Sequence, residues 1–288
     1  MSSAAQPIEH RGRLVGSPHR TIAVLRHLAL RGAAFIYLGV LVLLPVTAVI
    51  TKGFGDGFST FTDAMHVPGA WGAIRLTLVT GVIVAAINAV MGTTLAWVIV
   101  RYRFPGRRVL STVVDLPLAI PTLVWGVMIL VLYGPNSVIG RAFASVGIQV
   151  LFTPLAIVLS LCTITLPFVV RNVQPVLLEL DDAEEEAAAT LGASRITTFR
   201  RVVFPAIRSA VFAGTLLTFS RCLGEIGSVI LVSGNRSGHT LTAPVFIFSL
   251  TSQFRFAEAA AVATFLFAIS FVLVLITSTV LKRREVDA

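Results

Sequence analysis

Long apolar runs alternate with polar intervals along this chain of 288 residues. The runs cover residues 33–50, 76–100, 110–133, 152–170, 209–233 and 259–281. Each is close to the roughly 20 apolar residues that a helix needs to cross a bilayer. A cleaved signal peptide is the alternative for the first run, but no small-residue cleavage site ends it cleanly. The pattern therefore predicts an all-α, polytopic membrane protein with six transmembrane helices.

Charge and composition give that bundle an orientation. Hydrophobic residues make up 56% of the chain and charged residues only 13%, which is too apolar for a soluble domain. The net charge of +9 does not indicate nucleic-acid binding, because the basic residues fall in short clusters between the runs. Of the 23 Lys and Arg residues, 17 lie on one side of the six-helix topology and 5 on the other. The positive-inside rule places the richer side in the cytoplasm.

This orientation divides the chain into three parts. We expect a cytoplasmic basic segment at residues 1–32, a six-helix membrane domain at residues 33–281 and a cytoplasmic tail at residues 282–288. Both termini, and the polar loop at residues 171–208, then lie inside the cell.

The loop at residues 171–208 has the local signals of two short helices. Acidic residues at 184–186 suit the positive end of a first helix, and Gly192 suits a left-handed stop. Ser194 can cap a second helix, which we expect to end before Pro205. A structured loop in a membrane protein favours a docking surface, although this physics also allows a solvated connector.

Two membrane runs contain residues that interrupt or charge a helix. Pro117 and Pro121 predict a kink or break in the third run, either as a packing feature or as a gate on the pathway. Asp115 lies near the inner end of the same run, where a structural role as a cap is expected.

The fifth run carries two opposite charges four residues apart, Arg221 and Glu225. Arg221 is roughly 18 Å from the cytoplasmic end of this run at 1.5 Å per residue. A charge at that depth normally faces the bundle interior or water, so the pair indicates either a translocation pathway or a structural ion pair. Ser228 adds a hydroxyl group towards the outer mouth of the same predicted pathway.

Enzymatic chemistry is poorly supported by the residue pattern. Both cysteines, Cys162 and Cys222, lie inside apolar runs, which supports neither a disulfide nor a metal site. The only lysines, Lys52 and Lys282, are not in a Gly-Lys-Ser/Thr motif, so the chain is not a P-loop ATPase. All histidines lie outside the runs, which argues against an intramembrane enzyme. We expect the chain to bind no cofactor and no metal.

The polar loop resembles a known family motif. The residues that carry the resemblance are Glu186, Ala187, Ala188, Gly192, Val202, Phe204 and Pro205. Their spacing is similar to the EAA loop of bacterial ATP-binding cassette (ABC) importer permeases, with Val202 and Phe204 where that family has Ile and Leu. The resemblance implies that this loop forms coupling helices in a cleft of an ATPase subunit, which binds ATP and Mg.

Three further stretches resemble one branch of that family. They are Asp115–Thr122, Leu166–Pro175 and Leu223–Asn235. All are similar to sulfate/thiosulfate importer permeases, of the T type more than the W type, although Ile226 stands where T-type members usually have Tyr. The resemblance implies two ATPase subunits, a second permease subunit in a heterodimer, an extracytoplasmic binding protein and surrounding lipid.

Two alternatives remain on the sequence. A permease for molybdate, tungstate or another oxyanion is the nearest alternative, and this chain does not distinguish it, because the resemblance assigns affinity for the anion to the binding protein. An ATP-independent secondary transporter or channel is more distant.

Overall fold

The computed structural model describes residues 30–55 and 57–287, without the side chains at positions 60, 182 and 277–287. The chain divides into two compact units, with the boundary between Ala48 and Val49. The expected basic segment at residues 1–32 lies outside the described residues, apart from its last three positions.

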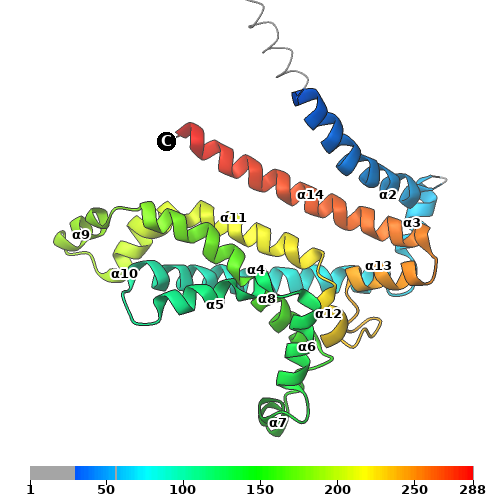
Figure 1. The fold of residues 1–288 in the computed structure, drawn as a ribbon, viewed down its shortest axis with the longest axis horizontal. Coiled ribbons are helices and arrows are strands. Elements are labelled where there is room, and N and C mark those ends of the chain that lie inside the picture. The colour runs from blue at the N-terminus through cyan, green and yellow to red at the C-terminus, as the bar shows by residue number, and fades with distance from the viewer. Residues whose placement is uncertain (1–29, 56, 288) are drawn as a thin grey trace, which may run out of the picture. The chain divides into compact units, whose positions relative to one another are not determined.

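The described residues form helices joined by short loops, without a strand (Figure 1). The first unit is helical from Leu30 and includes the π-helix η1 (Gly39–Leu43), after which α2 (Leu44–Phe54) follows. The second unit contains α3 (Phe58–Met65), α4 (Ala70–Arg101), α5 (Arg107–Ala119), α6 (Thr122–Tyr133), α7 (Val138–Ser145), α8 (Pro154–Glu179), α9 (Asp182–Thr190), α10 (Arg195–Thr198), the π-helix η2 (Phe199–Val203), α11 (Phe204–Leu223), α12 (Gly227–Val232), α13 (Ala243–Ser252) and α14 (Phe256–Asp287).

The predicted membrane helices are present. Five helical segments are long and apolar enough to cross a bilayer, and the bent pair α5 and α6 makes a sixth. Inside a bilayer only helices of this kind satisfy all backbone groups within one segment. Several boundaries differ from the expected ones. Helix α8, the fourth membrane helix, for example continues beyond the apolar run to Glu179 and includes the first part of the predicted loop.

The third run is a broken span, as its prolines allow. The axes of α5 and α6 differ by 112°, and the break falls at Ile120 and Pro121. Pro121 has no backbone N–H to continue α5 and stands at the N-cap of α6. Pro117 lies inside α5 and is buried.

The fifth run is not the continuous helix that we expected at residues 209–233. Helix α11 ends at Leu223, and a separate short helix, α12, begins at Gly227. Two glycines, Gly224 and Gly227, flank the break, and glycine is among the weakest helix formers. Hydrophobicity continues across this point, which is why the run alone does not reveal it.

Helices α4, α8 and α11 pack together as the centre of the second unit. Their contact is close because Val169 of α8 lies between two glycines, Gly92 of α4 and Gly214 of α11. A Cβ atom on Gly92 would lie 2.7 Å from Val169 Cβ, and one on Gly214 would lie 2.8 Å from Val169 Cα. Small residues at helix contacts are typical of membrane bundles, where backbones approach closely.

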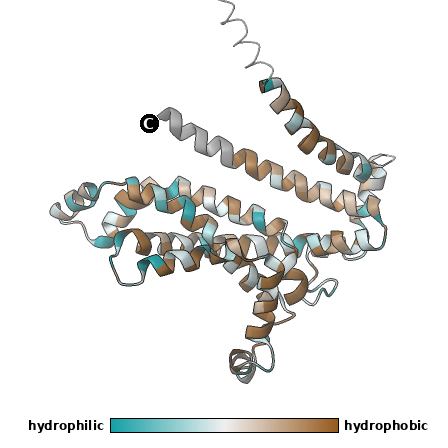
Figure 2. Cartoon of the chain, viewed as in Figure 1, coloured by the Kyte–Doolittle hydropathy of each residue, from teal (hydrophilic) through white to brown (hydrophobic). Residues whose placement is uncertain are grey.

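A second apolar cluster joins α4, α13 and α14. It is built from buried residues such as Ile74, Phe246, Leu250 and Val262. The outer surface remains strongly apolar as well, which Figure 2 shows as brown along much of α6. Exposed side chains on α6 include Leu123, Val124 and Val131. An exposed apolar face of this extent needs lipid or another protein against it.

The close approach at Val169 gives a stability prediction. Gly92→Ala forces a contact shorter than side chains tolerate, and overpacking of this kind costs about 1–3 kcal/mol. We expect a lower thermal unfolding midpoint for the detergent-purified protein. The matched control is Gly72→Ala on the same helix, where the new Cβ would meet only Gly238 Cα, at 3.7 Å. An equal shift in both variants would contradict the packing account.

Candidate functional site

The polar loop folds as the predicted helical hairpin. The Asp181 side chain accepts a hydrogen bond from the Ala183 N–H at 3.0 Å, which caps α9. Gly192 follows α9 with a φ of +83°, a left-handed conformation that glycine adopts without strain. Ser194 then caps α10 by accepting a hydrogen bond from the Thr197 N–H at 3.3 Å. Local sequence therefore determines where both helices begin and where the first one ends.

The second helix does not stop before Pro205, contrary to our expectation. The helical segment runs from Arg195 to Leu223 and passes through Pro205. The π-helical stretch η2 precedes the proline, and the Phe204 N–H bonds the Phe199 carbonyl five residues back. This wider turn accommodates a residue that lacks the N–H of an ordinary α-helical bond. The loop is thus continuous with α11.

Large apolar side chains are exposed on this hairpin. Leu191 is 89% exposed and Ile196 is 72% exposed, on either side of the turn at Gly192. Glu186 and Ala187 are also exposed, whereas Ala188 is half-buried. These features are typical of a surface that another protein covers.

The later residues of the predicted motif are placed differently. Val202 is half-buried, and Phe204 and Pro205 are exposed. Val203, between Val202 and Phe204, is fully buried in the cluster that α4, α8 and α11 share, so it anchors the hairpin. Sequence reasoning did not identify Val203.

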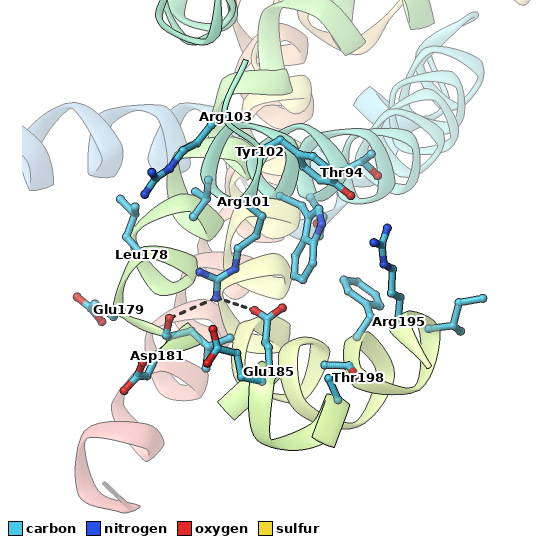
Figure 3. Close-up of a pocket in the computed structure, with 18 of the residues that line it drawn as sticks. Thr94, Arg101, Tyr102, Arg103, Leu178, Glu179, Asp181, Glu185, Arg195 and Thr198 are labelled. Carbon is cyan, nitrogen blue, oxygen red and sulfur yellow. Dashed lines mark hydrogen bonds and ion pairs between the residues drawn. The ribbon is translucent and has the colours of Figure 1, made fainter. Parts of the chain in front are cut away.

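An open cavity of about 1240 Å³ lies between the hairpin and the ends of α4 and α8. Figure 3 shows Arg101, the last residue of α4, at its centre. Its guanidinium lies 2.7 Å from Glu185 Oε1 and donates to the Leu180 carbonyl at 3.3 Å. Nothing in the sequence pairs Arg101 with Glu185, because they are far apart in the chain.

A second ion pair joins α5 to α8. Asp115 lies inside α5, so it does not cap a helix, and both of its oxygens accept from Arg171 of α8. Arg171 Nε donates to Asp115 Oδ1 at 2.7 Å. The same guanidinium bonds the Ser111 carbonyl and hydroxyl, each at 3.0 Å, and the Gln174 side chain. Asp115 is therefore half of an interhelical ion pair rather than the cap that we expected.

Arg221 and Glu225 also form an ion pair, with 2.6 Å between Nη2 and Oε2. They do not share a helix as we expected, because Glu225 lies in the break after α11. The other carboxylate oxygen accepts from the Ser228 N–H at 3.1 Å and the Ser228 hydroxyl at 3.3 Å. Glu225 thus satisfies the first turn of α12 and holds Arg221 at the same time. Glu225 is 2% exposed, whereas Arg221 is 36% exposed.

The two helix breaks meet in space. A Cβ on Gly227 would clash with Thr122 Oγ1 and would lie 2.9 Å from the Leu123 N–H nitrogen. Helices α6 and α12 pack together along this contact. Pro121 and Ser228 are the immediate chain neighbours of Thr122 and Gly227, the two residues that touch where the breaks meet. Asp115 is not part of this contact and pairs instead with Arg171. Among the described residues, no group of three His, Cys, Asp or Glu is placed to hold a metal ion.

This helical architecture is that of the permeases of ABC importers. It resembles the crystal structure of a bacterial alginate ABC transporter in complex with an alginate pentasaccharide-bound periplasmic protein. The TM-score is 0.75 at 19% identity, over 94% of this chain and 98% of that one. A structure of the methionine transporter MetNI is more distant, with a TM-score of 0.52 at 18% identity, over 74% of this chain and 94% of that one.

The chain belongs to the family of binding-protein-dependent transport system inner membrane components, whose model matches residues 88–286. It is 39% identical to the sulfate transport system permease protein CysT of Synechocystis sp., over 84% of each chain. It is 36% identical to CysT of Escherichia coli, over 88% of this chain and 91% of the relative. It is 41% identical to CysW of the same Synechocystis, over 87% and 91%.

The ion pair of α5 and α8 gives a second prediction. Asp115→Asn replaces two charge-assisted acceptors with one neutral acceptor, and the pair is partly exposed, so we expect a loss of about 1–2 kcal/mol. The thermal unfolding midpoint of the purified protein should fall. Thr112→Ala, on an exposed position of the same helix, should leave the midpoint unchanged. A stability unaffected by Asp115→Asn would show that the ion pair contributes nothing to the bundle.

Proposed function

We propose that this chain is the T-type permease subunit of an ATP-driven importer for sulfate and thiosulfate. The observation that carries the proposal is its identity with sulfate permeases over most of its length, 36–42% among the T-type relatives. The exposed hairpin supports it, because a permease of this family needs a surface for its ATPase. The chain forms one half of the pathway through the bacterial cell membrane.

The other components follow from this assignment. ATP and Mg bind to two ATPase subunits, which the hairpin α9 to η2 contacts through Glu186, Leu191 and Ile196. A W-type subunit supplies the second half of the pathway, which the similarity to CysW supports. An extracytoplasmic binding protein delivers the anion. Both termini and the hairpin face the cytoplasm, as the distribution of arginines favours.

The helices supply a physical route from the hairpin to the pathway. Movement of α9 acts on α8 directly through the short connection after Glu179. From α8 the pair Arg171–Asp115 reaches α5, which continues to the break at Pro121. The hairpin is also continuous with α11, which ends at Arg221 and the second break. Movement by either route arrives where α6 and α12 meet.

Reconstitution tests the proposed function. The chain is placed in vesicles with its W-type partner, ATPase subunits and binding protein, and uptake of radioactive sulfate is measured with ATP inside. We expect ATP-dependent sulfate uptake, reduced by excess thiosulfate. Uptake of molybdate or tungstate without uptake of sulfate would favour the alternative permease. Uptake by this chain alone would identify an ATP-independent transporter or channel.

We further propose that Arg221 lies on the anion pathway. Sulfate carries two negative charges, and an unpaired dianion in a low-dielectric region is very costly. The guanidinium is partly exposed while its partner Glu225 is buried, so the cationic side of the pair is the accessible one. Glu225 also limits how tightly Arg221 holds the anion, since conduction requires release. Pro121 and Ser228 then shape the pathway at the two breaks, and Pro117 shapes α5 just before the first of them.

This role gives a third prediction. Arg221→Met should reduce sulfate uptake at least tenfold in complexes that assemble normally, because no cation remains at the break. Arg221→Lys should retain part of the uptake. Glu225→Gln keeps an oxygen to accept from Ser228 and isolates the effect of the lost charge, so it should slow release of the anion. Wild-type uptake by well-assembled Arg221→Met would leave only a structural ion pair.

A further inference from the structure

One side chain that the sequence gives no reason to single out ties α9, the first helix of the hairpin, to the membrane bundle. Arg101 ends α4, and its guanidinium reaches α9 at Glu185 and the end of α8 at the Leu180 carbonyl (Figure 3). Both members of the ion pair are mostly buried, with side chains 15% and 24% exposed. Burial of this degree protects the interaction from the solvent screening that weakens surface pairs.

Two aromatic rings, Trp97 and Phe199, lie beside the same guanidinium and help to orient it. Its central carbon lies 5.9 Å from the centroid of the Trp97 ring, one turn earlier on α4. Trp97 packs edge-on against Phe199 of η2, with ring centroids 5.3 Å apart. Arg101 therefore touches the first helix of the hairpin through a charge and reaches the second through an aromatic contact. A planar guanidinium combines a directed ion pair with stacking on an aromatic ring better than the ammonium of a lysine does.

Helix α9 needs such a tie. It has nine residues, and a helix this short is not stable alone. Its packing partners along the chain are α10 and η2, which belong to the same hairpin. The three adjacent glutamates are not equivalent either, because Glu185 is turned towards Arg101 while Glu184 and Glu186 are exposed.

We propose that Arg101 is a positioning residue for coupling. It holds α9 at a fixed place and angle relative to α4, so that a displacement of the hairpin by the ATPase also displaces the end of α4. We call the ion pair between Arg101 and Glu185 the strut. Glu186, which matches the family motif, is exposed and can contact the ATPase. This inference rests on the proposed function, but the geometry of the strut can be tested without it.

The first measurement is the distance between α4 and α9. Spin labels are attached at Thr94 and Ala189, two exposed positions that line the cavity, in the full chain with Cys162 and Cys222 replaced by serine. We expect a narrow distance distribution in the parent protein. Arg101→Gln and Glu185→Gln should each broaden it, because α9 loses its tie. Glu184→Gln is the matched control and should leave it narrow.

The second measurement is the coupling ratio, the number of ATP molecules hydrolysed per sulfate imported, in the reconstituted complex. In Arg101→Gln and Glu185→Gln we expect ATP hydrolysis within twofold of the parent and sulfate uptake reduced about tenfold. The exchange Arg101→Glu with Glu185→Arg should restore at least a third of the uptake. A loss of packing alone would not be repaired by exchanging the charges.

The outcomes separate the strut from the proposed function. If the parent complex imports no sulfate, the proposed function fails, while the spin-label distances still decide whether Arg101 positions α9. Narrow distances and a normal coupling ratio in both single variants would overturn the strut. So would an exchange variant no better than the single ones. If neither single variant accumulates in the membrane, Arg101 and Glu185 are needed for folding and the coupling role is rejected.

Discussion

The close approach of α4, α8 and α11 is the constraint on which the rest of the structure depends. The two glycines beside Val169 allow these backbones to come close, and larger residues there would push α4 and α11 away from α8. Helix α8 carries Arg171 in its interior and leads into α9 at its end. Its position therefore determines where both the α5 ion pair and the hairpin lie.

Charges inside this bundle are joined in pairs that cross between elements. Arg171 connects α8 to α5, and Arg101 connects α4 to α9. Arg221 connects the end of α11 to Glu225, which accepts hydrogen bonds from Ser228 in the first turn of α12. In each case the arginine forms an ion pair with a carboxylate and stands where a helix ends, bends or meets another.

The sequence predicts what depends on neighbours along the chain and misses what depends on distant contacts. Apolar runs identify the membrane helices, and Gly192 and Ser194 locate the turn of the hairpin, because caps and left-handed turns act over three or four residues. The break after Leu223 escapes this reading, because hydrophobicity continues across it. The pairs of Arg101 and Arg171 escape it as well, since no local pattern joins residues separated by more than 50 positions.

The continuity of the helix from Arg195 to Leu223 has a mechanical consequence. At 1.5 Å per residue this rod is about 43 Å long, so a tilt of a few degrees at the hairpin becomes a shift of about 2–4 Å at its far end. Its one irregular stretch, η2, lies beside the hairpin, and beyond it the α-helix is unbroken to Leu223. A helix of this length converts a small angular displacement at one end into a larger displacement at the other, where Arg221 lies.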